Sequence, residues 1–396
     1  MAERVSKGDV IAFRLNAHHL TERLDGPKLL DAAGRCGIQN SPPGSALLAV
    51  HARVRDLTRE QVSEAVADEK SLLQTWSMRG SPFYFPTVDA PIFTTGVLPP
   101  TEKAMRHFVP GVEQTLTRLD MSLTEAVGLS GAEIDDVLSG RQLPINELGA
   151  EVAGRIAGKL PDEQRRSWEE EGPYAPDQPL GEGVVHFCIR ILTLQGLVCF
   201  APRSGNKAPF VLVDEWLGHP IPDIDPEAAR AELLRRYLRC YGPSTRADFA
   251  AWVGIQAGDT EPWWSLVEDE LTQVEFGGKS WILTEDVDRL RSAPTPKGVR
   301  LLPPRDPYTQ LRDRETIVDK KYRGEVWKTV GEPGTVLADG RITGIWRPRK
   351  SGRKLTITIK TFGSLPARTK KSLQDEAEQV APLRDASSVD VAFDTY

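Results

Sequence analysis

The sequence lacks an apolar stretch long enough to cross a lipid bilayer. The best candidate, residues 184–200, is interrupted by His186, Arg190 and Gln195. The first ten residues carry charged side chains of both signs, which is not the composition of a signal peptide. We therefore expect a cytoplasmic protein without a membrane partner.

Motifs for metals and nucleotides are also missing. The four cysteines, at positions 36, 188, 199 and 240, have no paired spacing, and there is no His-x-x-x-His pair. We expect buried free thiols and no metal. The segment Gly181-Glu182-Gly183 fails the dinucleotide fingerprint, because His186 stands where the third glycine belongs. Phosphate-binding loops and Gly-x-Ser-x-Gly elbows are absent, so we expect no cofactor and an unconventional site for any enzymatic activity.

An excess of positive charge is missing as well. The net charge is −6, from 50 Lys and Arg against 56 Asp and Glu, which argues against a generic nucleic-acid coat protein. The basic residues nevertheless gather between Arg312 and Lys354, and such a local patch attracts phosphate or is simply a solvated face. A chain of 396 residues predicts two to four domains.

Three blocks of the chain show the same order of signals, in which helical patterns are followed by two short strands around a turn. The expected helices are residues 6–23, 28–35, 44–55 and 58–68, then 113–129, 131–139, 148–158 and 184–195, then 226–241, 245–252 and 263–271. The expected hairpins are residues 75–90, 197–216 and 272–287. Each second strand leads into an acidic step that is typical of a helix start. This order is that of the winged helix, a fold that binds DNA or other proteins.

The last hundred residues alternate strand-forming segments with turns and end in a helical pattern over residues 365–383. We therefore predict an α+β protein with three tandem winged-helix units and a small C-terminal β-barrel or sheet domain closed by a helix. The predicted boundaries are residues 1–98, 99–222, 223–297 and 298–396.

The most unusual local sequence is the segment from Cys36 to Ala46. It places three polar side chains, Gln39, Asn40 and Ser41, directly before two prolines that stop any helix from running through them. A rigid polar linker of this kind is either a simple cap-and-turn connector or a site for chemistry.

Five ordered segments resemble one known family. They are residues 37–49 (GIQNSPPGSALLA), 75–80 (TWSMRG), 235–252 (RRYLRCYGPSTRADFAAW), 306–314 (DPYTQLRDR) and 339–346 (DGRITGIW). The chain is similar along nearly its whole length to the AlkZ-like and YcaQ-like bacterial DNA glycosylases, proteins with winged-helix DNA-binding domains. The resemblance implies a monofunctional DNA glycosylase that excises alkylated purines, including bulky N7-guanine or N3-adenine adducts of genotoxins, in base excision repair and self-resistance.

The resemblance also implies a catalytic centre in the linker. In the family this centre is a Gln-apolar-Gln or Gln-apolar-Asp triplet, and the matching residues are Gln39, Asn40 and Ser41. The first glutamine agrees, whereas the middle residue is polar here and serine replaces the last member. Residues expected to contact DNA are Arg14, His18, His19, His51, Arg53, Arg79, Lys320, Lys321, Arg323, Trp327 and Lys328.

The histidines at 18 and 19 are alternatively a surface pair. Segment 320–328 is either a loop or hairpin that probes the minor groove or a barrel strand whose aromatic residues point inward. The run Arg312, Asp313 and Arg314 is better explained as an internal ion-pair network. The expected partner is double-stranded DNA carrying alkylated bases, bound by a nucleoid-associated monomer without cofactor. The alternative functions are a non-catalytic winged-helix DNA-binding protein, either a transcription regulator or an adduct-shielding protein, and a protein-interaction scaffold.

Overall fold

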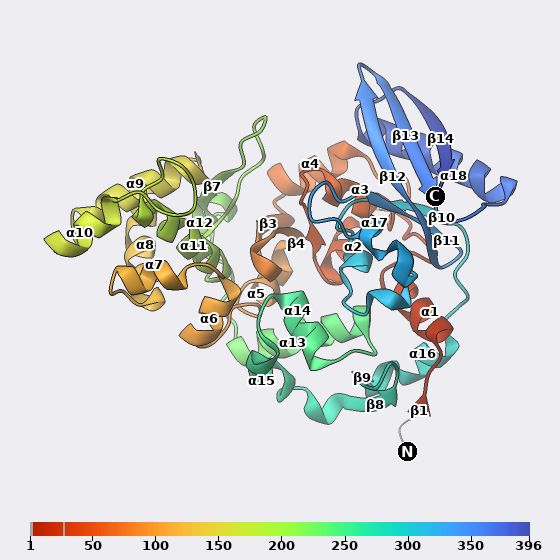
Figure 1. The fold of residues 1–396 in the computed structure, drawn as a ribbon, viewed down its shortest axis with the longest axis horizontal. Coiled ribbons are helices and arrows are strands. Elements are labelled where there is room, and N and C mark those ends of the chain that lie inside the picture. The colour runs from red at the N-terminus through yellow and green to blue at the C-terminus, as the bar shows by residue number, and fades with distance from the viewer. Residues whose placement is uncertain (1–2, 27) are drawn as a thin grey trace. The chain divides into compact units, whose positions relative to one another are not determined.

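The computed structural model describes residues 3–26 and 28–396 (Figure 1). The chain divides into two compact units. The first unit comprises the chain up to Glu64, Leu234–Phe249 and Val267–Tyr396, and the second comprises Ala65–Leu233 and Ala250–Leu266. Among the described residues, none of the helices has both the length and the apolar character needed to cross a membrane.

The elements follow one another as helices interrupted by short strand pairs. The helices are α1 (Lys7–Ala17), α2 (Leu29–Gly34), α3 (Ser45–His51), α4 (Arg59–Ala67), α5 (Ala90–Phe93), α6 (Glu102–Phe108), α7 (Glu113–Arg118), α8 (Leu123–Leu138), α9 (Ile145–Ala157), α10 (Asp162–Glu169), α11 (Leu180–Leu194), α12 (Val213–Leu217), α13 (Pro226–Tyr241), α14 (Arg246–Val253), α15 (Glu261–Trp264), α16 (Val287–Ser292), α17 (Arg323–Val326) and α18 (Ala367–Leu383). The strands are β1 (Glu3–Arg4), β2 (Ile38–Gln39), β3 (Leu72–Trp76), β4 (Pro82–Pro86), β5 (Leu143–Pro144), β6 (Val198–Phe200), β7 (Pro209–Leu212), β8 (Leu271–Glu275), β9 (Lys279–Leu283), β10 (Val299–Leu302), β11 (Gly334–Ala338), β12 (Arg341–Ser351), β13 (Lys354–Thr361) and β14 (Ser388–Thr395).

The three predicted hairpins are confirmed. Strands β3 and β4, β6 and β7, and β8 and β9 each form an antiparallel pair. The acidic step after each pair opens a short helix, namely α5, α12 and α16. At the tip of the last hairpin Gly277 and Gly278 have φ values of 62° and 123°, a backbone region that glycine adopts without steric cost.

In the second unit, helices α8, α9 and α11 pack against one another beside a small sheet. Strand β5 pairs antiparallel with β7, which also pairs with β6. The order helix, strand, two further main helices and hairpin is that of a winged helix. The predicted total of three such units stays a prediction, as do the four domain boundaries.

Several helix predictions need correction. The helix expected over residues 6–23 ends at Ala17, and the helix expected over residues 263–271 is absent beyond Trp264, where α15 ends. The sequence suggested a break between residues 129 and 131, but α8 runs through both, and the chain instead turns at Asp120, whose φ is 46°. Ser122 caps α8 by accepting a hydrogen bond from the backbone N–H of Glu125 at 3.0 Å. Helices α6 and α10 were not predicted, because both are short and lie in segments rich in proline or charge.

The C-terminal domain is an open sheet and not a barrel. Its five strands lie in the order β10-β11-β12-β13-β14, and the last strand runs parallel to β13 after the crossover helix α18 (Figure 1). Helix α18 covers one face, where Leu373, Ala377 and Val380 pack against apolar strand residues such as Ile357 and Trp346. The chain thus contains the predicted sheet and terminal helix, while β10 and β14 remain edge strands among the described residues.

Shortening Leu373 tests this core. The side chain is fully buried, so Leu373→Ala leaves a cavity and lowers the free energy of unfolding by about 2–5 kcal/mol. The neighbouring exposed residue provides a matched control, because Gln374→Ala on the same helix changes it by less than about 0.5 kcal/mol. Urea denaturation followed by tryptophan fluorescence measures both, and equal effects would contradict the assignment.

Candidate active site and nucleic-acid interface

The polar linker joins β2 to α3 in the first unit. Gln39 ends the strand and is 3% exposed, Asn40 is 7% exposed, and Ser41 is half-buried. The hydroxyl of Ser45, the first residue of α3, donates to the carbonyl oxygen of Gln39 at 3.1 Å. The backbone that carries Gln39 is therefore fixed to the helix that follows the two prolines.

Asn40 closes the turn. Its Oδ1 atom accepts hydrogen bonds from the backbone N–H of Gly44 at 2.9 Å and of Ala46 at 3.4 Å. These are N–H groups at the start of α3 that have no partner within the helix. The middle residue of the triplet, apolar in the family pattern, thus acts here as a cap that holds the linker in shape.

Ser41 is the half-exposed member of the triplet and contacts a cation. Its Oγ atom accepts a hydrogen bond from Arg305 Nη1 at 3.4 Å. Arg305 in turn faces Glu332, whose Oε1 accepts from the Arg305 backbone N–H at 3.2 Å and whose Oε2 lies 3.9 Å from Nε. Burial raises the pKa of the Glu332 carboxyl above its ordinary value. The third position of the triplet therefore contacts a cation that is itself paired with a carboxylate.

A fully buried ion pair lies behind the linker. Arg53 is 2% exposed and Asp306 is completely buried, and two hydrogen bonds of 2.8 Å join the guanidinium to the carboxylate. Arg53 also donates to the carbonyl of Ala49 at 2.7 Å, and Asp306 accepts from the Tyr308 backbone N–H at 2.9 Å. The pair connects the chain just after α3 to the segment that carries Arg305. Arg53 is therefore a structural residue, and its burial does not fit the predicted phosphate contact.

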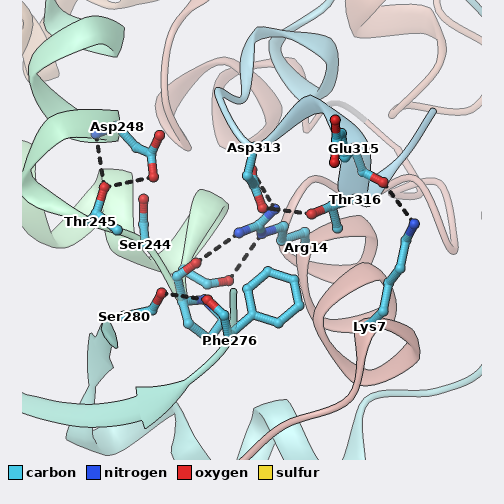
Figure 2. Close-up of polar contacts among 12 residues, drawn as sticks. Lys7, Arg14, Ser244, Thr245, Asp248, Phe276, Ser280, Asp313, Glu315 and Thr316 are labelled. Atoms are coloured by element: carbon cyan, nitrogen blue, oxygen red, sulfur yellow. Dashed lines mark hydrogen bonds and ion pairs between the residues drawn. The ribbon is translucent and has the colours of Figure 1, made fainter. Parts of the chain in front are cut away.

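Arg14 is a second buried arginine of the first unit that is held by an ion pair (Figure 2). Its side chain is 1% exposed and donates to both oxygens of Asp313, at 3.0 and 2.7 Å, and to the carbonyls of Gly242 and Pro243 at 3.2 and 2.8 Å. These bonds occupy the guanidinium, so the predicted contact of Arg14 with DNA does not fit the structure. Of the run that was expected to form an internal ion-pair network, Asp313 is paired in this way with Arg14.

The histidines expected at the DNA surface lie inside or at the edge of the first unit. His18 and His51 are 1% and 4% exposed, which does not fit a direct DNA contact. His19 is half-buried, and its Nε2 accepts a hydrogen bond from Arg35 Nε at 2.9 Å. Burial lowers the pKa of His51 to about 4, and burial with the charge of Arg35 lowers the pKa of His19 to about 4. Both rings are therefore neutral at neutral pH.

In the second unit, Arg79 lies in the turn between β3 and β4. It is half-buried, its Nη1 donates to the carbonyl of Trp252, and its guanidinium lies 5.7 Å from the ring centroid of Phe83. The expectation of an exposed arginine is therefore not met. Trp76, at the end of β3, packs against Phe200 and Phe210 at centroid distances of 5.5 and 5.0 Å.

The basic segment Lys320–Lys328 includes α17 and shows two kinds of side chain. Lys320 and Lys321 are exposed. Arg323 and Lys328 are paired with Glu315 at 2.6 Å and Glu325 at 3.1 Å. Trp327 Nε1 donates to the carbonyl of Thr309 at 3.0 Å, and its ring carries the Arg314 guanidinium at 4.7 Å from the centroid. The tryptophan is thus held against the protein, but the segment is helical and is not the barrel strand that the alternative expected.

Three residues near the linker were not predicted from the sequence. Arg35 is exposed, four positions before Gln39, and Arg305 contacts Ser41 and pairs with Glu332. A signal for Arg305 was present, because the adjacent segment 306–314 carries part of the family resemblance. Nothing in the sequence pointed to Glu332, which lies 291 positions after Ser41 in a loop and approaches it only through the fold.

The chain matches the model of one protein family over most of its length. The model of the family described as "DNA glycosylase AlkZ-like" matches residues 33–383. The chain therefore belongs to the AlkZ-like DNA glycosylases, and it is an enzyme of the DNA glycosylase class.

Its relatives cover the whole chain. An "Interstrand DNA cross-link repair glycosylase" from Streptomyces sahachiroi is 27% identical in an alignment of 406 residues, and the alignment covers 98% of this chain and 99% of the relative. The solved structure of Streptomyces sahachiroi DNA glycosylase AlkZ has a TM-score of 0.76 and 24% identity, covering 98% of this chain and 100% of that one. This structural likeness shows a common α+β fold.

The buried Arg53–Asp306 pair yields a test. Asp306→Asn leaves the guanidinium of Arg53 buried without a counter-ion, which lowers the free energy of unfolding by about 3–5 kcal/mol. The exposed pair of Arg55 and Asp25 provides the control, and Asp25→Asn costs less than about 1 kcal/mol. Chemical denaturation of both variants measures the difference. Unchanged stability of Asp306→Asn would show that the buried pair does not hold the linker.

Proposed function

We propose that this DNA glycosylase hydrolyses the N-glycosidic bond of alkylated purines, with bulky N7-guanine or N3-adenine adducts of genotoxins as its substrates. The observation that carries the proposal is the rigid neutral linker Gln39-Asn40-Ser41, which is held by α3 and contacted at Ser41 by Arg305, itself paired with Glu332. The relative in Streptomyces sahachiroi is named for the repair of interstrand cross-links in DNA, which is consistent with bulky adducts. Such an enzyme serves base excision repair and the self-resistance of a cell exposed to a genotoxin.

The chemistry of the substrate explains why a neutral linker suffices. Loss of an unmodified base needs help for the leaving group and for an oxocarbenium-like transition state. Alkylation at N7 or N3 makes the purine cationic, so the base leaves without a general acid. The protein then has to orient a water molecule and stabilise the positive charge that develops on the sugar. Amide and hydroxyl oxygens can accept hydrogen bonds from water and face a developing cation.

The linker residues divide these tasks. Gln39 is the residue whose side-chain amide orients the water, because it is the member that agrees with the family pattern. Asn40 has a positioning role, since its Oδ1 accepts from the start of α3. Ser41 supplies a second oxygen at the place where the family has glutamine or aspartate, and Arg305 holds that oxygen. The weak basicity of these groups favours a labile, already cationic substrate and spares intact DNA.

The DNA contacts we propose are the exposed cations of the first unit. Lys320 and Lys321 face solvent, as does Arg35 beside the linker. His19 is bound to Arg35, and Arg323 and Lys328 exchange their carboxylate partners for phosphate. The enzyme acts on double-stranded DNA as a monomer in the nucleoid, and the three helix-and-hairpin blocks within residues 1–98, 99–222 and 223–297 are its winged-helix units.

The catalytic assignment is tested by removing the amide. Gln39→Ala slows the release of base from DNA containing a defined N7-alkylguanine at least about 100-fold, because one preorganised transition-state contact is lost. Binding of the same DNA changes less than about threefold, since Gln39 does not contact the phosphates. Abasic-site cleavage and chromatography of the free base measure release, and fluorescence anisotropy measures binding. Full activity of Gln39→Ala overturns the assignment. If the wild-type protein binds this DNA but releases no base, the result supports the adduct-shielding alternative.

The DNA interface is tested by a salt titration. Each phosphate contact adds about 0.9 to the slope of log affinity against log salt, so the double variant Lys320→Ala and Lys321→Ala lowers the slope by roughly 2. The matched double variant with arginine at both positions keeps the charge and the slope. An alanine variant with an unchanged slope would place the phosphate contacts elsewhere.

A further inference from the structure

Three chemistry-bearing side chains that are far apart in the sequence meet in the first unit. His18 follows the last turn of α1, Cys36 lies just after α2, and Cys240 lies in the last turn of α13. A ring nitrogen of His18 and the two Sγ atoms all lie within 4.8 Å of one another. The three residues are 1–3% exposed, and both cysteines are free thiols. The cluster is therefore preorganised and sealed from bulk water.

The histidine of this cluster lacks a partner for its polar atoms. Within the described residues, neither Nδ1 nor Nε2 of His18 has a hydrogen bond, although both are buried. Its ring is held edge-on between Tyr241 and Tyr308, with centroids at 5.1 and 5.7 Å. A buried ring nitrogen without a partner is costly, because it has lost its hydrogen bond to water. A bound electron-pair acceptor at the ring nitrogen of His18 would remove the cost of burying this nitrogen without a hydrogen bond.

The donor set selects the class of ligand. Two thiolates and an imidazole are the preferred ligands of a soft or borderline metal ion such as Zn²⁺. Two thiolates and a neutral histidine around a divalent ion have zero net charge. The buried arginine nearby, Arg53, is already neutralised by Asp306 at 2.8 Å. A divalent ion therefore fits here without leaving a net charge in the interior.

The spacing also fits a tetrahedral ion. With metal–sulfur distances of about 2.3 Å, neighbouring ligand atoms lie roughly 3.8 Å apart, so the cluster has to contract by no more than about 1 Å. The Tyr241 hydroxyl lies 3.7 Å from Cys36 Sγ and is the oxygen placed to complete the coordination. The buried hydroxyl of Tyr308, whose ring packs edge-on against His18, has no hydrogen-bond partner among the described residues.

We propose that His18, Cys36 and Cys240 bind one Zn²⁺ ion. The ion joins the end of α1, the segment after α2 and the end of α13. Its ligand Cys36 lies three residues before Gln39 in the sequence. Its role is structural: it fixes the start of the catalytic linker and takes no part in base release. The spacing of these ligands in the sequence is 18 and 204 positions, which explains why motif inspection expected no metal.

The first experiment measures the metal in the full-length protein. The chain is expressed in zinc-supplemented medium, purified without a metal-chelating column, and analysed by inductively coupled plasma mass spectrometry. We expect about one equivalent of zinc per chain, which remains after dialysis against EDTA. Alkylation of the thiols under native conditions, followed by peptide mass spectrometry, then shows whether the ion protects Cys36 and Cys240. In the same mild denaturant, protein treated with a chelator should show at least tenfold more labelling of both thiols than protein kept with excess Zn²⁺, and its melting temperature should be several degrees lower.

Variants with a matched control complete the test. Cys36→Ala, Cys240→Ala and His18→Phe should each retain less than a tenth of an equivalent of zinc. The control is Cys188→Ala, which removes an equally buried free thiol of the second unit and should retain the full equivalent. Should a variant fail to fold, the labelling of the wild-type thiols decides the question on its own. None of these measurements depends on glycosylase activity.

Three results would overturn the proposal. One is a wild-type protein without zinc that also fails to bind Zn²⁺ when the reduced chain is titrated in competition with a chromogenic chelator. Another is equal zinc loss in Cys188→Ala and Cys240→Ala. The third is a disulfide between Cys36 and Cys240 after purification with the thiols blocked at lysis, because oxidised sulfur is not a ligand for the ion.

Discussion

The buried pairing of Arg53 with Asp306 is the interaction on which the candidate site depends. Each charge would be costly to bury alone. The two parallel hydrogen bonds between the guanidinium and the carboxylate offset this cost in only one relative orientation of the two groups. That geometry sets the end of α3 against the segment that begins at Arg305. One side of the linker is thereby fixed through α3 and Asn40, and the other through Arg305 and Ser41. The ordered linker is a consequence of this pair and not of the linker's own sequence alone.

The features that could be predicted from the sequence are those with local signals. The three hairpins are indicated by strand-forming segments on either side of a glycine-bearing turn. Helix α13 has the bounds that its sequence pattern indicates. The C-terminal sheet and α18 were also predicted, but the sequence left barrel and sheet open. Closure depends on which strands become edges, and this is decided by the parallel pairing of β14 with β13 across a helix. No local pattern encodes such a pairing.

The site shows the same division. The linker could be located because two prolines after three polar residues are unusual, and because a resemblance supported it. The burial of Arg14, His18, His51 and Arg53 could not be predicted, since arginine and histidine are mostly exposed residues. Their partners lie far along the chain: Asp313 is 299 positions from Arg14, and Asp306 is 253 positions from Arg53. A basic side chain that was assigned to DNA by its type thus proves to be part of the interior.

These separations have a consequence for biosynthesis. The first unit begins with the earliest helices and is completed by the five-stranded sheet, whose core includes Leu48 of α3. On the ribosome, Arg53 emerges long before Asp306, so a nascent chain holds an unpaired charge that disfavours closure of the interior around the linker. A chain that stops before Asp306 lacks the counter-ion, and its Gln39 is not held in place. Premature fragments are therefore expected to lack an ordered linker around Gln39.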